Sequence, residues 1–255
     1  MRNGWTGGQY SVYRFALGAG LAVHFALSLG EGRLSLGGLV CAAGLALGVA
    51  DRWAALLGAI LAVPASPALV ALLAAHAATP EKPYGSWAAR GRSDPRGGWR
   101  MPRWHPFYAL APGWVVPAVR DPQPATLYYD GDCGLCHRAV RFVLAEDPEG
   151  GAFRFAPLAS ESFANALSET ERAALPDSLV VRTPDGGTRV RTAAVREICR
   201  RLGGLWRALA LASHAVPERW LDRGYDAIAR NRKRLFARPA EACPLVPVDL
   251  RARFL

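Results

Sequence analysis

Three long runs without a charged side chain fill the first part of the chain, and they limit its possible folds more than any other feature. The runs cover residues 15–30, 34–50 and 53–78, and short charged breaks separate them. A helix that crosses a bilayer needs about 20 mostly apolar residues. The pattern predicts about three connected transmembrane helices in residues 1–79, with the third run broken at Pro64 and Pro67. A buried helical core is the less favoured alternative.

Residues 80–124 form a basic connector rich in proline, arginine and tryptophan. Positively charged segments next to membrane helices tend to stay in the cytoplasm. With three spans, the C-terminal half also lies there, which predicts an integral protein of the cell (inner) membrane with a cytoplasmic C-terminal domain. A fourth, irregular span within residues 104–119 would place that half on the other side.

The excess of positive charge bears on the partners. The chain has 31 Lys and Arg against 21 Asp and Glu, a net charge of +10. This charge suits anionic lipid head groups or nucleic acid. Because the chain contains no recognised nucleic-acid-binding module, membrane lipid is the expected partner and nucleic acid is not. A basic amphipathic helix predicted from Pro217 onward either lies on an anionic membrane surface or packs on its own domain.

From residue 125 the pattern changes to short strands alternating with helices. Residues 126–129 and 153–155 are β-prone, and a capping box at 168–171 marks a short helix. Residues 184–187 form a turn between two further strand segments, and Thr192 is expected to cap a helix. The order strand, helix, strand, helix, strand, strand, helix predicts a thioredoxin-like α/β domain over residues 125–255.

Cys133 and Cys136 lie where the first of these strands runs into its helix. At a helix N-terminus, unpaired N–H groups and the positive end of the helix dipole favour a thiolate, which is the attacking form of cysteine. Cys136, one turn further on, can resolve a mixed disulfide. Asp130 can accept a proton from Cys136 or relay it through water. These positions predict dithiol–disulfide exchange, with the Cys133–Cys136 disulfide as the redox centre and no separate cofactor.

The segment DGDCGLC at 130–136 resembles the D-x-x-C-x-x-C signature of the DCC family of thiol-disulfide oxidoreductases, which is assigned to the thioredoxin superfamily. The similarity continues in RFV, FRFAPL, LGGLW, YDAIARNR and CP, at 141–143, 153–158, 202–206, 225–232 and 243–244. By this resemblance Asp130, Cys133 and Cys136 carry the redox role, and a protein or small-molecule thiol or disulfide is the partner.

The resemblance implies two further features. The first half is similar, in SVYRFALG at 11–18 and PYGSW at 83–87, to the HTTM or DoxX-like membrane domains found beside DCC modules. Thioredoxin-like proteins usually place a cis-proline directly before the third strand, and Pro176 is the nearest candidate. The function implied is therefore that of a membrane-anchored thiol-disulfide oxidoreductase.

The same cysteines allow other interpretations. Cys133–His137 is also a C-x-x-C-H pattern, which is typical of c-type haem attachment with His137 as axial ligand. A zinc site would need two more ligands, for which Cys199 and Cys243 are the candidates. A purely structural pair is the remaining alternative. In each case the protein is a non-enzymatic, membrane-anchored binding module. His24 and His76, in the apolar runs, are weak functional candidates or packed core histidines.

Overall fold

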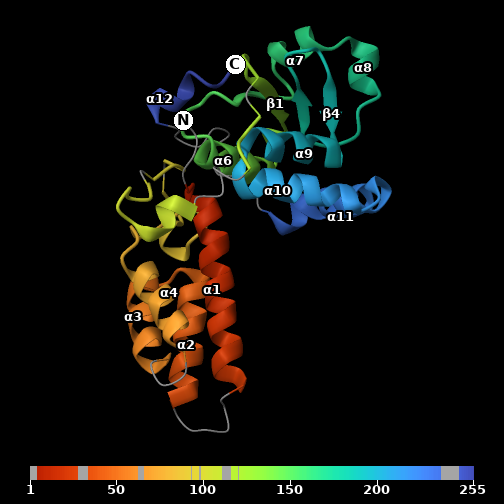
Figure 1. The fold of residues 1–255 in the computed structure, drawn as a ribbon. Coiled ribbons are helices and arrows are strands. Elements are labelled where there is room, and N and C mark those ends of the chain that lie inside the picture. The colour runs from red at the N-terminus through yellow and green to blue at the C-terminus, as the bar shows by residue number, and fades with distance from the viewer. Residues whose placement is uncertain are drawn as a thin grey trace. The chain divides into compact units, whose positions relative to one another are not determined.

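The computed structural model describes two compact units. The described residues are 5–27, 34–62, 66–92, 94–97, 99–110, 116–119, 121–236 and 247–255. The helical unit comprises residues 3–92 and 96–114, and the sheet unit comprises residues 1–2, 93–95 and 115–255. Figure 1 shows the elements of each unit.

Four α-helices pack side by side in the helical unit (Figure 1): α1 (Gly7–Leu27), α2 (Leu34–Leu47), α3 (Asp51–Ala62) and α4 (Pro67–Ala77). Two 3-10 turns follow, η2 (Trp87–Ala89) and η3 (Pro106–Leu110). The third apolar run breaks as expected, because α3 ends at Ala62 and α4 begins at Pro67, with the Ser66 side chain capping the new helix. Helices α1 and α2 approach closely at Gly18, where a Cβ would lie 2.6 Å from the backbone nitrogen of Ala46.

A hydrogen-bonded polar cluster is buried inside the helical unit. The hydroxyl of Tyr10 lies 2.6 Å from Nδ1 of His76 and 3.1 Å from Oγ1 of Thr79. Nε2 of His76 lies 3.9 Å from Asp51, and Arg14 donates to the carbonyl of Leu45. His76 is therefore packed and hydrogen-bonded.

Aromatic side chains surround this polar cluster. Trp99 stacks on Tyr10 with ring centroids 5.1 Å apart, so part of the proline-rich connector packs against α1. His24 lies half-buried against Phe25 at the other end of α1.

The predicted integral membrane location is wrong. Helices α2, α3 and α4 have 14, 12 and 11 residues, and at about 1.5 Å per residue each falls short of the roughly 30 Å hydrocarbon core. Helix α1 has 21 residues but includes Gln9, Arg14 and His24. Across the part of the chain that the structure describes, no helix combines the length and the apolar character needed to cross a bilayer. The inner-membrane location and the cytoplasmic side of the redox domain were both inferred from such spans and lose their basis.

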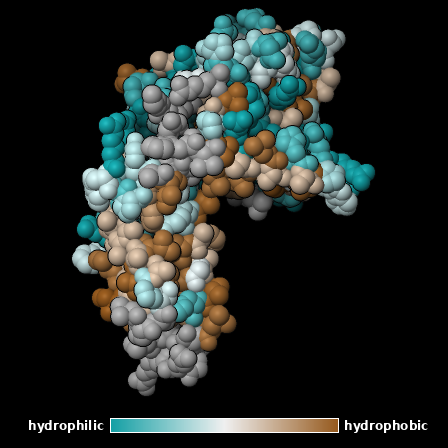
Figure 2. All heavy atoms as spheres, in the orientation of Figure 1, coloured by the Kyte–Doolittle hydropathy of each residue, from teal (hydrophilic) through white to brown (hydrophobic). Residues whose placement is uncertain are grey.

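The apolar runs contribute to the outside of the helices as well as to the core. Figure 2 shows hydrophobic residues on the visible face of the helical unit. Large apolar side chains with more than half of their surface exposed include Phe15, Val23, Val40, Trp53 and Ile60. An uncharged sequence run therefore does not identify which of its side chains are buried.

The sheet unit contains a four-stranded mixed sheet in the order β2-β1-β3-β4. Its strands are β1 (Ala125–Tyr129), β2 (Phe153–Pro157), β3 (Val180–Arg182) and β4 (Thr188–Val190). Strand β1 pairs parallel with β2 and antiparallel with β3, which pairs antiparallel with β4. Helix α6 (Gly134–Glu146) connects β1 to β2, and α7 (Glu161–Ala166) and α8 (Glu169–Ala173) precede β3.

The chain after β4 is helical, with α9 (Arg191–Leu202), α10 (Gly204–Ala212), η4 (Ser213–Ala215), α11 (Glu218–Leu235) and α12 (Val248–Arg251). Helices α10 and α11 both pack against α9 (Figure 1). The strands follow the predicted order, α7 and α10 are helices that the sequence pattern did not predict, and the sheet is compatible with a thioredoxin-like fold.

The alternation of side chains along the strands separates two apolar cores. Leu127, Phe155 and Val181 face the core that α6 and α9 help to form. Tyr128 and Val180 face the other side, where they pack with residues of α7. Because β1 is buried between both cores, its carboxyl end holds the following turn in a fixed position.

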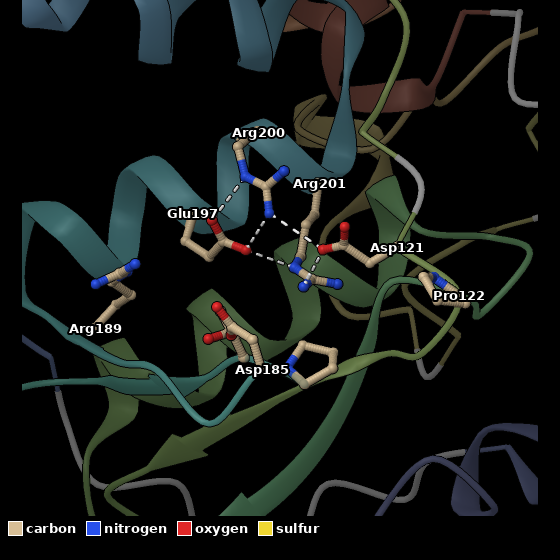
Figure 3. A pocket seen from close by; sticks show the side chains of 9 residues that line it. Asp121, Pro122, Asp185, Arg189, Glu197, Arg200 and Arg201 are labelled. Atoms are coloured by element: carbon tan, nitrogen blue, oxygen red, sulfur yellow. Dashed lines mark hydrogen bonds and ion pairs between the residues drawn. The ribbon is translucent and has the colours of Figure 1, made fainter.

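A network of ion pairs joins the segment before β1 to α9 (Figure 3). It lies at the start of β1, away from the turn that follows the carboxyl end of this strand. Arg200 contacts Glu197 at 2.6 Å and Asp121 at 3.2 Å, and Arg201 pairs with the same two carboxylates. These groups line a cavity of about 420 Å³. Because their charges are paired with one another, the network ties the segment before β1 to the end of α9.

Candidate active site

The turn between β1 and α6 is organised by backbone hydrogen bonds around Cys133. Cys133 is the N-cap of α6, in an extended conformation, and its sulfur accepts the amide N–H of Cys136 at 3.3 Å. The amide of Cys133 donates to the carbonyl of Asp130 at 3.3 Å, and a carboxylate oxygen of Asp130 accepts the amide of Asp132 at 2.9 Å. The structure thus brings the three predicted site residues together in one tight turn.

The two sulfurs differ in their environments. Burial raises the pKa of the Cys136 thiol to about 12, and a hydrogen bond with Cys133 adds to this rise. Cys136 therefore retains its proton at neutral pH. The sulfur of Cys133 accepts the Cys136 amide at the N-terminus of a helix, where negative charge is stabilised. The sulfur of Cys133 is thus a hydrogen-bond acceptor, whereas the sulfur of Cys136 carries a proton.

Both cysteines are nearly inaccessible. Cys133 is 1% exposed and Cys136 is 5% exposed. A reacting sulfur therefore needs a change in the surrounding side chains to reach Cys133.

Arg232 of α11 is a site residue that the sequence interpretation missed. Its side chain is 4% exposed, and its Nη2 lies 3.0 Å from Asp130 and 2.7 Å from Asp177. Burial opposes its charge, but the hydrogen bond with Asp177 and the charges of Asp177, Cys136 and Cys133 raise the pKa of Arg232. The signal was present in the sequence, because residue 232 follows Tyr225 by seven positions and so lies on the apolar side of the helix.

Tyr225 is a second contribution of α11. Its hydroxyl accepts the amide N–H of Leu179 at 3.0 Å. Burial raises the pKa of Tyr225, and the charge of Cys136 contributes to the rise. Helix α11 therefore reaches both the segment before β3 and the neighbourhood of the cysteines. Pro176, the expected cis-proline, has a trans peptide bond, as do all described residues.

Of the further residues proposed for haem or zinc binding, His137 lies on α6 with the cysteines and Cys199 lies on α9. Nε2 of His137 lies 2.8 Å from the carbonyl oxygen of Gly131. Cys199 lies on α9, where burial raises its pKa to about 11, and Cys243 lies outside the described residues. Within the described ranges, no group of three or more His, Cys, Asp and Glu side chains is placed to hold a metal ion.

Comparisons with known proteins relate the sheet unit to a known family. A family model described as DCC1-like thiol-disulfide oxidoreductase matches residues 127–238. The chain is 35% identical over 133 residues to "Uncharacterized protein YuxK" of Bacillus subtilis, covering 51% of this chain and 92% of that protein. It is 30% identical over 125 residues to "DCC family protein At1g52590, chloroplastic" of Arabidopsis thaliana, covering 49% and 71%. No solved structure matches.

The family match begins within β1 and extends just beyond α11. It includes the turn with Cys133 and Cys136 as well as Arg232. The similarity of the first half to HTTM or DoxX-like membrane domains is not supported by these matches.

Proposed function

The chain belongs to the DCC1-like thiol-disulfide oxidoreductase family, and on that premise we propose that Cys133 and Cys136 are its redox pair. As a thiol-disulfide oxidoreductase, the protein acts on thiol or disulfide partners. In this proposal the domain of residues 125–255 adopts a thioredoxin-like fold and carries the chemistry. Cys133 attacks and Cys136 resolves, and the Cys133–Cys136 disulfide is the only redox centre required.

The exchange proceeds in two balanced steps. The Cys133 thiolate attacks one sulfur of a substrate disulfide, a mixed disulfide forms, and the other substrate sulfur leaves as a thiolate. Cys136 then loses its proton and attacks the Cys133 sulfur, which releases the second substrate thiolate and forms the Cys133–Cys136 disulfide. The substrate gains two electrons and the protein loses two. The same steps in reverse oxidise a substrate dithiol.

The observation that carries this proposal is the hydrogen bond from the Cys136 amide to the Cys133 sulfur, at 3.3 Å. The donor lies in the first turn of α6, where backbone N–H groups have no partner within the helix. A negative sulfur at Cys133 gains more from this N–H than a neutral one. Together with the raised pKa of Cys136, this supports Cys133 as the attacking sulfur.

Asp130 has a positioning role in this proposal. One of its carboxylate oxygens accepts the amide of Asp132 and the other accepts from Arg232. With both oxygens occupied, Asp130 serves the exchange by holding the turn and the guanidinium in place.

The test is a disulfide-reduction assay with the full chain, using dithiothreitol as the electron donor and a small aromatic disulfide as the substrate. We expect Cys133→Ser to abolish the protein-dependent rate. Cys199→Ser, a matched change of a cysteine on α9, should leave it unchanged. With Cys136→Ser, the mixed disulfide on Cys133 should accumulate and appear in the intact mass. Full activity in Cys133→Ser would refute the proposed role of this residue.

A further inference from the structure

We propose that Arg232 supplies the positive charge that stabilises the Cys133 thiolate, and that Asp130 and Asp177 are the positioning residues that hold its guanidinium. This inference rests on the proposed function, in which Cys133 is the attacking sulfur. It assigns helix α11 to the active site.

Three segments of the sheet unit meet at Arg232. The residue lies near the end of α11, and its Nη2 contacts Asp130 of the turn after β1 at 3.0 Å. The same nitrogen contacts the Asp177 carboxylate at 2.7 Å, and Nη1 donates to the carbonyl of Asp177 at 3.4 Å. Because the contacts come from two separate loops, the guanidinium is restrained on both sides.

One donor of the guanidinium remains unused. Nε of Arg232 is buried and has no hydrogen-bond partner among the residues that the structure describes. A buried donor without an acceptor costs about 1–3 kcal/mol, and more when the group is charged. A negative charge on a neighbouring sulfur would reduce this cost, so the buried guanidinium favours the thiolate over the neutral thiol more than an uncharged side chain would.

Asp130 connects Arg232 to the cysteine turn, because its carboxylate pairs with the guanidinium at 3.0 Å and its carbonyl accepts the amide N–H of Cys133 at 3.3 Å. Burial and the hydrogen bond with Cys133 raise the pKa of Cys136, and Arg232 is the charged side chain that opposes this rise. Conversely, the charges of Cys136 and Cys133 both favour the charged form of Arg232. The guanidinium and the cysteine pair therefore belong to one electrostatic cluster.

The electrostatic effect of each charged group on the sulfurs depends on how exposed that group is to water. The side chain of Arg232 is 4% exposed, whereas those of Asp130 and Asp177 are 23% and 76% exposed. Water screens an exposed charge strongly, while a buried charge interacts through a lower effective dielectric constant. Asp177 can therefore anchor the guanidinium while contributing little repulsion at the sulfurs.

The main experiment measures the alkylation rate of Cys133 by iodoacetamide in the reduced full chain, from about pH 4 to 9, with the modified peptide identified by mass spectrometry. In Arg232→Gln we expect the midpoint of the profile to rise by about one to two pH units. At a pH below the midpoints of both proteins, each pH unit of this rise makes the alkylation of Cys133 about tenfold slower in Arg232→Gln than in the wild type. Arg232→Lys, which keeps the charge, should recover at least half of the shift.

The matched control is Arg230→Gln, which removes the same charge from an exposed position of the same helix. Its midpoint should move by less than about 0.3 unit, because exposed charges are screened. An Arg232→Gln profile that coincides with that of Arg230→Gln would overturn the inference.

A measurement on the wild-type protein covers the case in which Arg232→Gln does not fold. The Nε–H resonance of Arg232 in a ¹H–¹⁵N NMR spectrum should shift with the same midpoint as the alkylation of Cys133. After Cys133 has been alkylated, this shift should disappear. A resonance that does not change across the alkylation midpoint would also overturn the inference.

Failure of the inference is distinguishable from failure of the proposed function. Full disulfide-reduction activity in Cys133→Ser removes the function, whatever the profile of Arg232→Gln. Loss of activity in Cys133→Ser together with an unshifted Arg232→Gln profile leaves the function intact and removes only the role of Arg232.

Discussion

Arg232 and Asp130 are 102 positions apart in the sequence, yet their side chains form an ion pair of 3.0 Å beside the cysteine turn. The contact joins the last long helix of the sheet unit to the end of its first strand. It makes α11 a structural part of the site, and it pairs a buried positive charge with the turn that holds the two buried cysteines.

Replacing Asp130 should destabilise the sheet unit. In Asp130→Ala, Arg232 keeps its contacts with Asp177 but loses one of its two carboxylate acceptors among the described residues. We expect the free energy of unfolding, measured with urea, to fall by about 1–3 kcal/mol. Asp132→Ala changes an exposed carboxylate two positions away and should cost less than about 0.5 kcal/mol. Equal losses in the two variants would contradict the role assigned to Asp130.

The resolving step should accelerate as the pH rises. The pKa of Cys136 in the reduced pair is raised to about 12, first by burial and then by its hydrogen bond with Cys133. Burial persists in the mixed disulfide, so the reactive thiolate fraction of Cys136 should still increase about tenfold per pH unit near neutrality. We expect the decay of a mixed disulfide on Cys133, followed by mass spectrometry, to show this dependence between about pH 6 and 8. A rate that is constant over this interval would show that Cys136 is already ionised.

Acid should weaken the helical unit through His76. Burial lowers the pKa of His76 from 6.5 to about 4, and the charge of Arg14 and the neighbouring His105 act in the same direction. The unfolded chain therefore takes up the proton first. The stabilisation is present above about pH 6.5 and is lost as the pH falls through about 4, with a maximum loss of about 3 kcal/mol.

Urea unfolding at neutral and acidic pH, followed by tryptophan fluorescence, tests this dependence, because Trp99 stacks on Tyr10 beside His76. The matched variant is His76→Asn, which has no group that titrates in this range. Its unfolding free energy should fall less on acidification than that of the wild type. An identical fall in both proteins would assign the acid sensitivity to other groups.

Two glycines should respond in opposite directions to alanine. Gly203 has a φ of 75°, and a Cβ there would lie 2.5 Å from the backbone nitrogen of Ala118. We expect Gly203→Ala to lower the free energy of unfolding by about 2 kcal/mol or more, because the backbone would be strained at this φ and the new Cβ would overlap with Ala118. Gly224 lies within α11 with open space around it, so Gly224→Ala should stabilise the protein by about 0.5–1 kcal/mol. Thermal unfolding measures both effects, and a tolerated Gly203→Ala would contradict the close contact.

The features that sequence reasoning predicted best depend on neighbouring residues. The capping box at Ser168 and Glu171 is present, and the turn at 184–187 joins β3 to β4. Cys133 lies at the start of α6, as its position after a strand indicated. Each of these is determined within a few residues by hydrogen bonds or turn geometry, so a local pattern is sufficient to identify it.

The membrane spans show where local patterns mislead. The absence of charge in residues 34–50 and 53–78 predicts helices long enough to cross a bilayer. The helices in these runs have at most 14 residues, because α2 ends at Leu47 and Pro67 starts a new helix. A run without charges indicates that a segment is apolar. The length of a helix depends instead on where turns and caps interrupt the chain.

By itself the sequence determined the order of strands and helices, the family of the sheet unit and the placement of Cys133 and Cys136 in one turn. Only the tertiary structure decided that Cys133 is 1% exposed and that Arg232 pairs with Asp130 and Asp177. The physical reason is that burial and charge pairing depend on which faces of distant elements meet. Along the sequence, the spacing of Arg232 from Tyr225 places it on the apolar side of a basic helix, but only packing decides that this side meets Asp130 and Asp177.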